Sequence, residues 1–171
     1  MTTTFTRFPS PVGELLLAAS DTALTGIFFP MRHGPAPEEQ PGWLEDVGRG
    51  PAGELLDRAR RQLTEYFART RIAFDLPLDP PGTTFERRVW DLLRTIPYGA
   101  TTSYGELARR LGDPRATRAV GAANGKNPIP IIVPCHRVVG ARGELTGFGG
   151  GLDRKRWLLE HEGALLPLGR A

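Results

Sequence analysis

Residues 127–140 read NPIPIIVPCHRVVG, and this stretch decides how the rest of the chain can be interpreted. It holds the only cysteine of the protein, Cys135, between Pro134 and His136. The run IIV at 131–133 is short, apolar and rich in β-branched residues, which predicts a strand or extended segment buried on both sides. Cys135 should therefore follow a hydrophobic wall and have an imidazole beside it.

Two interpretations of Cys135 are open from these residues alone. A lone buried cysteine is most often a small apolar side chain. A thiol next to an imidazole can instead be a nucleophile with its base. A single cysteine excludes an intramolecular disulfide and a multi-cysteine zinc site, and it suits a reducing compartment. We therefore expect no metal and no cofactor.

The composition is that of an ordinary globular protein. With 171 residues, 40% of them hydrophobic, the chain can form one domain or two small ones. Its start does not resemble a signal peptide, and no segment approaches the roughly 20 apolar residues of a membrane span. A cytoplasmic protein with no membrane partner is expected.

Charge differs between the two halves of the chain. Residues 1–81 carry 8 Lys and Arg against 11 Asp and Glu, whereas residues 82–171 carry 14 against 8. The half that holds the cysteine is therefore the basic one. Phosphate contacts by Arg and Lys supply most non-specific DNA affinity, so this asymmetry favours a DNA-facing C-terminal domain. An ordinary basic surface is the alternative.

The N-terminal half predicts an α/β domain over residues 1–76. Apolar runs within 4–29, broken by turn residues, indicate a small antiparallel sheet. Residues 30–50 are rich in Pro and Gly and predict a loop, in which Trp43 should dock. From Pro51 the apolar residues recur at helical spacing, so a helix should cover the sheet.

A short strand is predicted next, at 72–75, followed by a proline-rich linker at 77–82. The C-terminal domain, 83–171, should then begin with a helix capped at Thr83–Thr84. A second helix should follow Thr102–Ser103, with Glu106 closing a capping box.

A third helix is predicted at about 115–124, after a turn that contains Gly112. Two short helices joined by such a turn form a helix-turn-helix, which by itself is a weak sign of DNA binding. The third helix is rich in alanine and glycine. Small residues allow close approach to a shallow groove but few base-specific hydrogen bonds, so sequence-independent binding is expected.

Three segments around the cysteine stand at specific spacings: PCHRVVG at 134–140, LTGFGGG at 145–151 and WLLEHEG at 157–163. With Asn127–Pro128, they make the chain resemble the O6-alkylguanine-DNA alkyltransferases, which are suicide DNA-repair proteins. The resemblance covers residues 82–163 and, more loosely, the chain before them.

This resemblance implies an α/β (α+β) fold, with a ribonuclease H-like N-terminal domain of a small antiparallel sheet plus a helix. The C-terminal domain would be helical and winged helix-turn-helix-like. It also implies repair of O6-alkylguanine, and of O4-alkylthymine, by base flipping and irreversible single-turnover transfer of the alkyl group to Cys135. The partner would be double-stranded DNA, bound through its minor groove with the alkylated guanine flipped out. We expect a monomer, and cooperativity on DNA stays open.

The resemblance also implies roles for individual residues. Cys135 would be the nucleophile, His136 would take its proton through a water, and Glu162 would orient the imidazole. Asn127 would be a hinge between the helix-turn-helix and the active-site segment. Tyr104 would crowd the phosphate and hydrogen-bond the departing guanine.

The implied base pocket has backbone carbonyls of Cys135 and Val138 as acceptors for the exocyclic amine, and Phe148 and Pro130 as walls. Arg118 would insert into the base stack. The implied DNA contacts are Tyr104, Arg115, Arg118, Gly121, Ala122 and Asn124.

Two positions depart from the family pattern. Many relatives have tyrosine at Phe148, and some have serine at Gly149. The glycine removes a side-chain contact to O6 and should open the pocket to larger alkyl groups. The lone cysteine also separates the chain from the adaptive-response regulators, which add a zinc-bound cysteine domain, so repair without transcriptional control is expected.

Three other functions compete with this one: a silent binder of alkylated guanine, a cysteine hydrolase using Cys135 and His136, and a sequence-specific helix-turn-helix regulator. Purely structural roles also compete, since Arg118 could pair with Asp113 and Tyr104 could pack against Leu107.

Overall fold

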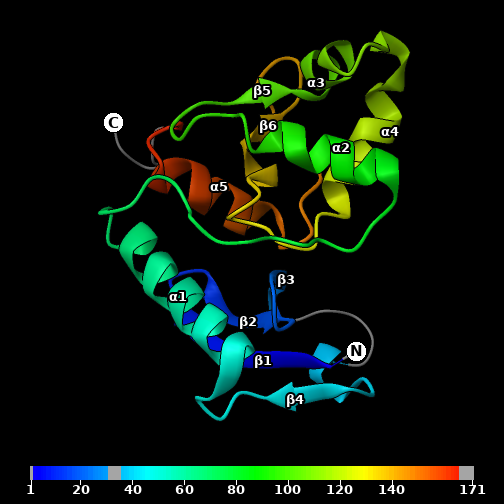
Figure 1. Ribbon diagram of the computed structural model, residues 1–171. Coiled ribbons are helices and arrows are strands. Elements are labelled where there is room, and N and C mark those ends of the chain that lie inside the picture. The colour runs from blue at the N-terminus through cyan, green and yellow to red at the C-terminus, as the bar shows by residue number, and fades with distance from the viewer. Residues whose placement is uncertain (1, 31–35, 166–171) are drawn as a thin grey trace. The chain divides into compact units, whose positions relative to one another are not determined.

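The computed structural model describes residues 2–30 and 36–165 and divides into two compact units, Met1–Pro81 and Gly82–Ala171 (Figure 1). The predicted linker, 77–82, is hydrogen-bonded over its first part. Leu24 donates its backbone N–H to the Pro77 carbonyl and accepts from Asp79 N, both at 2.9 Å. Residues 77–79 thus run beside a strand of the first unit.

The first unit contains a four-stranded sheet in the order β3-β2-β1-β4. Its strands are β1 (Thr3–Ser10), β2 (Gly13–Ala19), β3 (Leu24–Phe28) and β4 (Trp43–Glu45). The first three are antiparallel as predicted, but β4 pairs parallel to β1, so the sheet is mixed. Trp43 docks as predicted, with its ring centroid 6.3 Å from Phe5 and 5.8 Å from Phe28.

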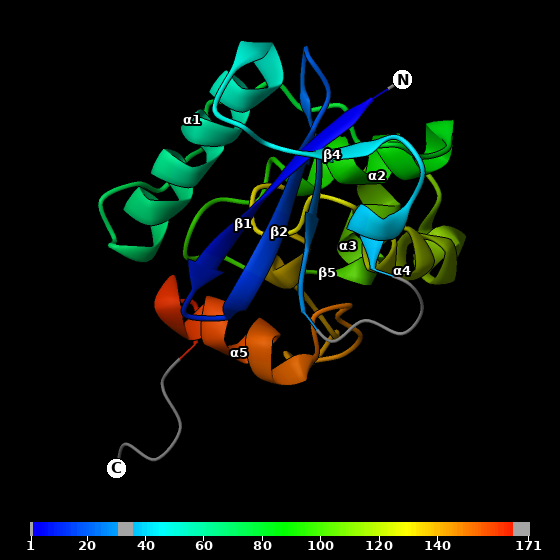
Figure 2. The same cartoon turned by 90° about the horizontal axis from the view of Figure 1, so that it is seen from below.

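A short 3-10 helix, η1 (Pro37–Glu39), precedes β4. Helix α1 (Gly50–Phe67) then lies against β1 and β2, as Figure 2 shows. Its apolar stripe is fully buried at Leu56, Ala59, Leu63 and Tyr66, as its helical spacing predicts.

The predicted strand at 72–75 does not form. The side-chain amide of Gln62 donates to the Asp75 carbonyl and accepts from the Asp75 N–H, both at 2.9 Å. Because a side chain satisfies both backbone groups of Asp75, they are not available to a neighbouring strand.

The second unit begins with α2 (Thr84–Leu93), which Thr83 and Glu86 close with a reciprocal capping box. It continues with β5 (Thr102–Ser103), α3 (Tyr104–Arg110), η2 (Pro114–Ala116), α4 (Thr117–Gly125), η3 (Cys135–Arg137), β6 (Val138–Val139) and α5 (Leu152–His161). The buried Trp90 of α2 joins α4 to the core, because its indole N–H donates to the Ala123 carbonyl at 2.8 Å.

The helix-turn-helix forms between α3 and α4, with Gly112 in the left-handed region at φ 89°. Ser103 caps α3 by accepting from Glu106 N, but the Glu106 carboxylate pairs with Arg109 and Arg110 instead of completing the predicted box. The third helix starts later than predicted, at Thr117, because Asp113 closes a 3-10 turn by accepting from Arg115 N.

Strand β5 pairs in parallel with β6, Thr102 opposite Val138 and Ser103 opposite Val139. This short pairing ties the start of α3 to the residues that follow Cys135. Within the described part of the chain, no helix has the length and apolar character needed to cross a membrane.

Candidate active site

Cys135 follows a buried turn, where a strand was predicted. Val133 N donates to the Ile129 carbonyl at 3.0 Å, and Ile131 adopts a left-handed conformation with φ 74°. The run is buried as expected, yet Pro130 and Pro134 lack the N–H groups that a central strand would need. A β-branched residue at positive φ is strained, so the surrounding contacts must hold this turn in place.

Asn127 is one of those contacts. Its amide donates to the Val133 carbonyl at 2.8 Å and accepts from Ile129 N at 3.0 Å, which closes the turn across both ends. The side chain at the end of the helix-turn-helix thus fixes the segment that carries the cysteine.

The Cys135 thiol is buried, with 5% of the residue exposed. Burial raises its pKa to about 11, although Asn127, the Lys155 ammonium and nearby backbone N–H groups oppose the rise. A thiol with this pKa is protonated at neutral pH, so a base has to remove its proton before the sulfur can act as a nucleophile.

His136, fully buried, is paired with Glu162. Its Nε2 lies 2.8 Å from Glu162 Oε2. Arg137 donates to the same carboxylate from Nε at 2.8 Å and from Nη2 at 3.0 Å. Its Nη1 donates to the Ile96 carbonyl at 2.7 Å. A buried carboxylate thus has two partners from the turn that carries the cysteine.

Electrostatics define the protonation state of this pair. Burial alone would raise the pKa of Glu162, but hydrogen bonds from His136 and Arg137 outweigh it and hold the pKa at about 2. Burial lowers the pKa of His136, against the pull of Glu162. The carboxylate is therefore ionised and can only accept, so Nε2 of a neutral His136 carries the proton. Its buried Nδ1 has no hydrogen-bond partner within the described residues and is the basic nitrogen.

Lys155 was missed by the sequence analysis. It is fully buried, and its Nζ donates to the Val138 carbonyl at 2.6 Å and to the Thr146 carbonyl at 2.7 Å. Burial lowers its pKa to about 8, while Cys135 opposes the shift. A signal was available, because Lys155 stands three and four residues before Leu158 and Leu159 and so lies on the buried face of α5.

Of the predicted site residues, Val138 and Tyr104 lie beside this lysine, whose Nζ is 5.9 Å from the centroid of the Tyr104 ring. The Val138 carbonyl accepts from Lys155, and the Tyr104 hydroxyl donates to the Thr146 carbonyl at 3.2 Å. Tyr104 thereby ties α3 to the glycine-rich loop, in which Phe148 is half-buried and Gly149 exposed. Pro130 is buried in the turn before the cysteine.

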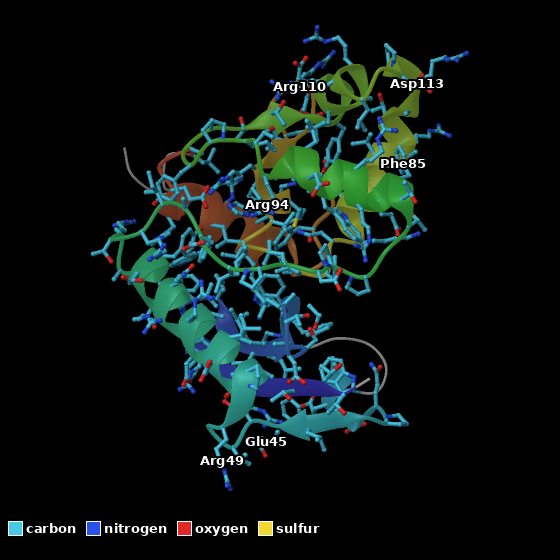
Figure 3. The ribbon with its side chains drawn as sticks, in the orientation of Figure 1. Glu45, Arg49, Phe85, Arg94, Arg110 and Asp113 are labelled. Atoms are coloured by element: carbon cyan, nitrogen blue, oxygen red, sulfur yellow. The ribbon has the colours of Figure 1, made fainter. Side chains whose placement is uncertain are left out.

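Of the six predicted DNA contacts, five are exposed or partly exposed and one is buried. Arg115, Arg118 and Ala122 are exposed, and Tyr104 and Gly121 are partly exposed. Asp113 pairs with Arg115 at 3.5 Å, and not with Arg118. Figure 3 shows Asp113 and Arg110 at the edge of the second unit, where α3 turns toward α4.

Asn124 corrects the sequence-based prediction of a DNA contact. Only 3% of it is exposed, and its amide donates inward to the Cys135 carbonyl at 3.4 Å. It faces the core because it lies four residues after the buried Val120, on the same face of α4.

Among the described residues, no group of His, Cys, Asp and Glu side chains could hold a metal ion.

Known protein families match both units. Residues 3–80 match the ribonuclease-like domain of 6-O-methylguanine DNA methyltransferase, and residues 84–164 match its DNA-binding domain. A methylated-DNA–protein-cysteine methyltransferase from Methanosarcina acetivorans is 47% identical over 157 residues, which cover 92% of this chain and 96% of that protein.

Solved structures agree with this match. The crystal structure of the Mycobacterium tuberculosis O6-methylguanine methyltransferase has a TM-score of 0.83 and 47% identity, covering 98% of this chain and 96% of that one. The structure of M. tuberculosis OGT in complex with DNA has a TM-score of 0.82 and 46% identity, covering 96% and 94%. These likenesses confirm the predicted fold class, and the chain belongs to the 6-O-methylguanine DNA methyltransferase family.

Proposed function

We propose that this protein removes alkyl groups from O6 of guanine in double-stranded DNA by transferring them to Cys135, once per molecule. The observation that carries the proposal is the buried Cys135 thiol, followed in the chain by the buried His136–Glu162 pair at 2.8 Å. Family membership supplies the substrate class, and the relatives' names, methylated-DNA–protein-cysteine methyltransferase, describe this reaction.

The transfer is an in-line substitution at the alkyl carbon. The S–C bond to Cys135 forms as the C–O6 bond breaks, and the electron pair of that bond stays on the guanine. The thiol proton passes through a bridging water to Nδ1 of His136, and Glu162 stabilises the resulting imidazolium. A proton from Tyr104 to the ring lets the guanine leave neutral, and the Tyr104 hydroxyl regains a proton from solvent. The product thioether has no leaving group, so Cys135 is not regenerated.

DNA binding falls to the exposed residues of α4 and the turn before it. A base stacked in a duplex cannot reach a buried thiol, so the alkylated base has to flip out, at a cost of a few kcal/mol. Arg118 would fill the place that the base leaves, and Arg115 would contact phosphate. Small residues such as Ala122 suit close approach in the minor groove. O4-alkylthymine would react by the same displacement, and the protein would act in the cytoplasm.

Intact-protein mass after mixing with a duplex that holds one O6-methylguanine tests the proposal, with Cys135→Ser as the matched variant. We expect one added methyl per wild-type molecule, saturating at one, and none on the variant. Tight lesion binding without a mass change would favour a silent binder. Turnover of ester or peptide substrates would favour a hydrolase, and binding to one DNA sequence without transfer would favour a regulator.

A further inference from the structure

The side-chain amide of Asn124 is the polar link between α4 and the main chain of Cys135. Its Nδ2 donates to the Cys135 carbonyl at 3.4 Å, and Val138 N donates to the same oxygen to close η3. The other end of the amide, Oδ1, is buried and has no hydrogen-bond partner within the described residues. Half of this buried amide is therefore satisfied by one long hydrogen bond, and half is not.

Such an arrangement is unfavourable for folding. A buried acceptor without a partner loses its hydration and gains nothing in return. Gln62, the buried amide of the first unit, shows the alternative, because both ends of it are bonded to Asp75 at 2.9 Å. An apolar side chain of the same size at position 124 would avoid the loss. Stability of the fold does not account for an asparagine there.

Two further observations point to the cysteine. The second buried side-chain atom that lacks a partner among the described residues is Nδ1 of His136, the residue next to Cys135. Asn124 is also held firmly, since the preceding residue, Ala123, accepts the indole N–H of Trp90 at 2.8 Å. A rigid helix end thus presents the amide to the carbonyl of the reactive residue.

We propose that Asn124 is a positioning residue that sets the Cys135 carbonyl as an acceptor for the exocyclic amine of the flipped guanine. The inference rests on the proposed function. Val138 N–H is part of the same turn as this carbonyl and moves with it, whereas Asn124 approaches from α4. The hydrogen bond from Asn124 therefore fixes the position of the Cys135 carbonyl oxygen relative to α4, the helix that the proposed function places on DNA. Because this hydrogen bond is long and therefore weak, a bound guanine amine can share the lone pair that it occupies.

The amine is the feature that separates this role from a merely structural one. Duplexes carrying O6-methylguanine and O6-methylhypoxanthine, which is the same base without the exocyclic amine, are compared by second-order rate constants of methyl transfer. We expect wild type to prefer O6-methylguanine, and Asn124→Leu to reduce that preference roughly three- to tenfold. The free energy of base flipping differs between the two bases. This difference cancels when the variant's ratio of the two rate constants is divided by the ratio for wild type.

Thermal unfolding of the same proteins separates positioning from folding. Leu matches Asn in shape and removes the unpaired acceptor, so Asn124→Leu should unfold at the wild-type temperature or above it. Asn124→Asp keeps the size but places an acceptor against the Cys135 carbonyl, and it should lose the preference as well. Gln62→Leu is the matched control. It should lower the unfolding temperature and leave the preference for the amine unchanged.

Each outcome decides the matter. If Asn124→Leu slows methyl transfer from both substrates equally, the proposal is wrong. It is also wrong if the variant prefers O6-methylguanine more strongly than wild type does, because the Asn124 amide would then compete with guanine for the carbonyl. If wild type methylates itself with neither duplex, the proposed function fails instead, independently of Asn124.

Discussion

Oε2 of Glu162 lies 2.8 Å from Nε2 of His136 and 3.0 Å from Nη2 of Arg137, so one buried carboxylate oxygen accepts from both residues that follow Cys135. This arrangement makes Glu162 responsible for two properties at once. It fixes the tautomer of the proposed base, and it neutralises a buried guanidinium. Activity and stability should therefore both depend on its charge.

Glu162→Gln keeps the shape of the side chain and removes its charge, so it tests the dependence of activity and of stability on that charge. The buried Arg137 loses its counter-charge, which should lower the free energy of unfolding by about 3–5 kcal/mol. The imidazolium that forms during transfer also loses its stabilisation, so the transfer rate should fall roughly 100-fold. Urea denaturation and single-turnover transfer measure the two quantities. Glu160→Gln, in the last turn of α5 and two residues before Glu162, is the control and should change both only slightly.

Acid should destabilise the wild type through the same carboxylate. The pKa of Glu162 is about 2 in the folded protein against an ordinary 4.5. Its contribution of about 3 kcal/mol is therefore fully present above pH 4.5 and is lost as the pH falls toward 2. The difference in unfolding free energy between wild type and Glu162→Gln should shrink over that range. A difference that stays constant from pH 6 to pH 2.5 would contradict the assigned pKa.

Lys155 should promote thiolate formation at neutral pH. Its ammonium acts against the burial that raises the pKa of Cys135 to about 11. Its own pKa of about 8 means that this help disappears as the solution becomes alkaline. Lys155→Met should therefore react with iodoacetamide several-fold more slowly than wild type at pH 7, and the gap should close above pH 8.

The other lysine of the chain is the control for that experiment. Lys126 is exposed and lies 3.7 Å from Glu86, so Lys126→Met changes the charge equally without touching the cysteine. Its reactivity profile should match that of wild type. A rate gap for Lys155→Met that persists unchanged to pH 10 would show that its effect is structural and not electrostatic.

Arg118 should contribute to DNA binding and not to the chemistry of the thiol. It is exposed on α4, so Arg118→Ala should weaken binding to lesion-free duplex and reduce the slope of log K against log salt by about 1. The rate of thiol alkylation by iodoacetamide should not change. Arg60→Ala, an equal change of charge on α1, provides the comparison, and equal salt slopes for the two variants would argue against contact of Arg118 with DNA.

Gly149 should set the size of the alkyl group that the pocket accepts. A Cβ there would come no closer than 4.0 Å to a neighbouring atom, the Gly125 carbonyl oxygen, so Gly149→Ser should fold normally. The added hydroxyl should narrow the pocket and lower the ratio of benzyl to methyl transfer. An unchanged ratio would show that position 149 does not face the alkyl group.

Much of the fold could be predicted because its signals are local. The apolar face of α1, the cap of Thr83 on α2, and the cap of Ser103 on α3 each depend on residues within a few positions of one another. The adjacency of Cys135 and His136 in the chain is equally local. Helical periodicity and capping need no knowledge of distant partners, so they can be seen in the sequence.

The rest depended on partners that are far apart in the chain. Whether the run at 131–133 is a strand or a turn was decided by Asn127, which takes up the backbone groups of Ile129 and Val133. Asn124 was predicted to contact DNA, but in the folded chain its amide donates to the Cys135 carbonyl. Lys155 belongs to the site because α5 brings its Nζ to the Val138 carbonyl. Buried polar groups must find partners wherever the folded chain brings them, and that choice of partner belongs to the tertiary structure.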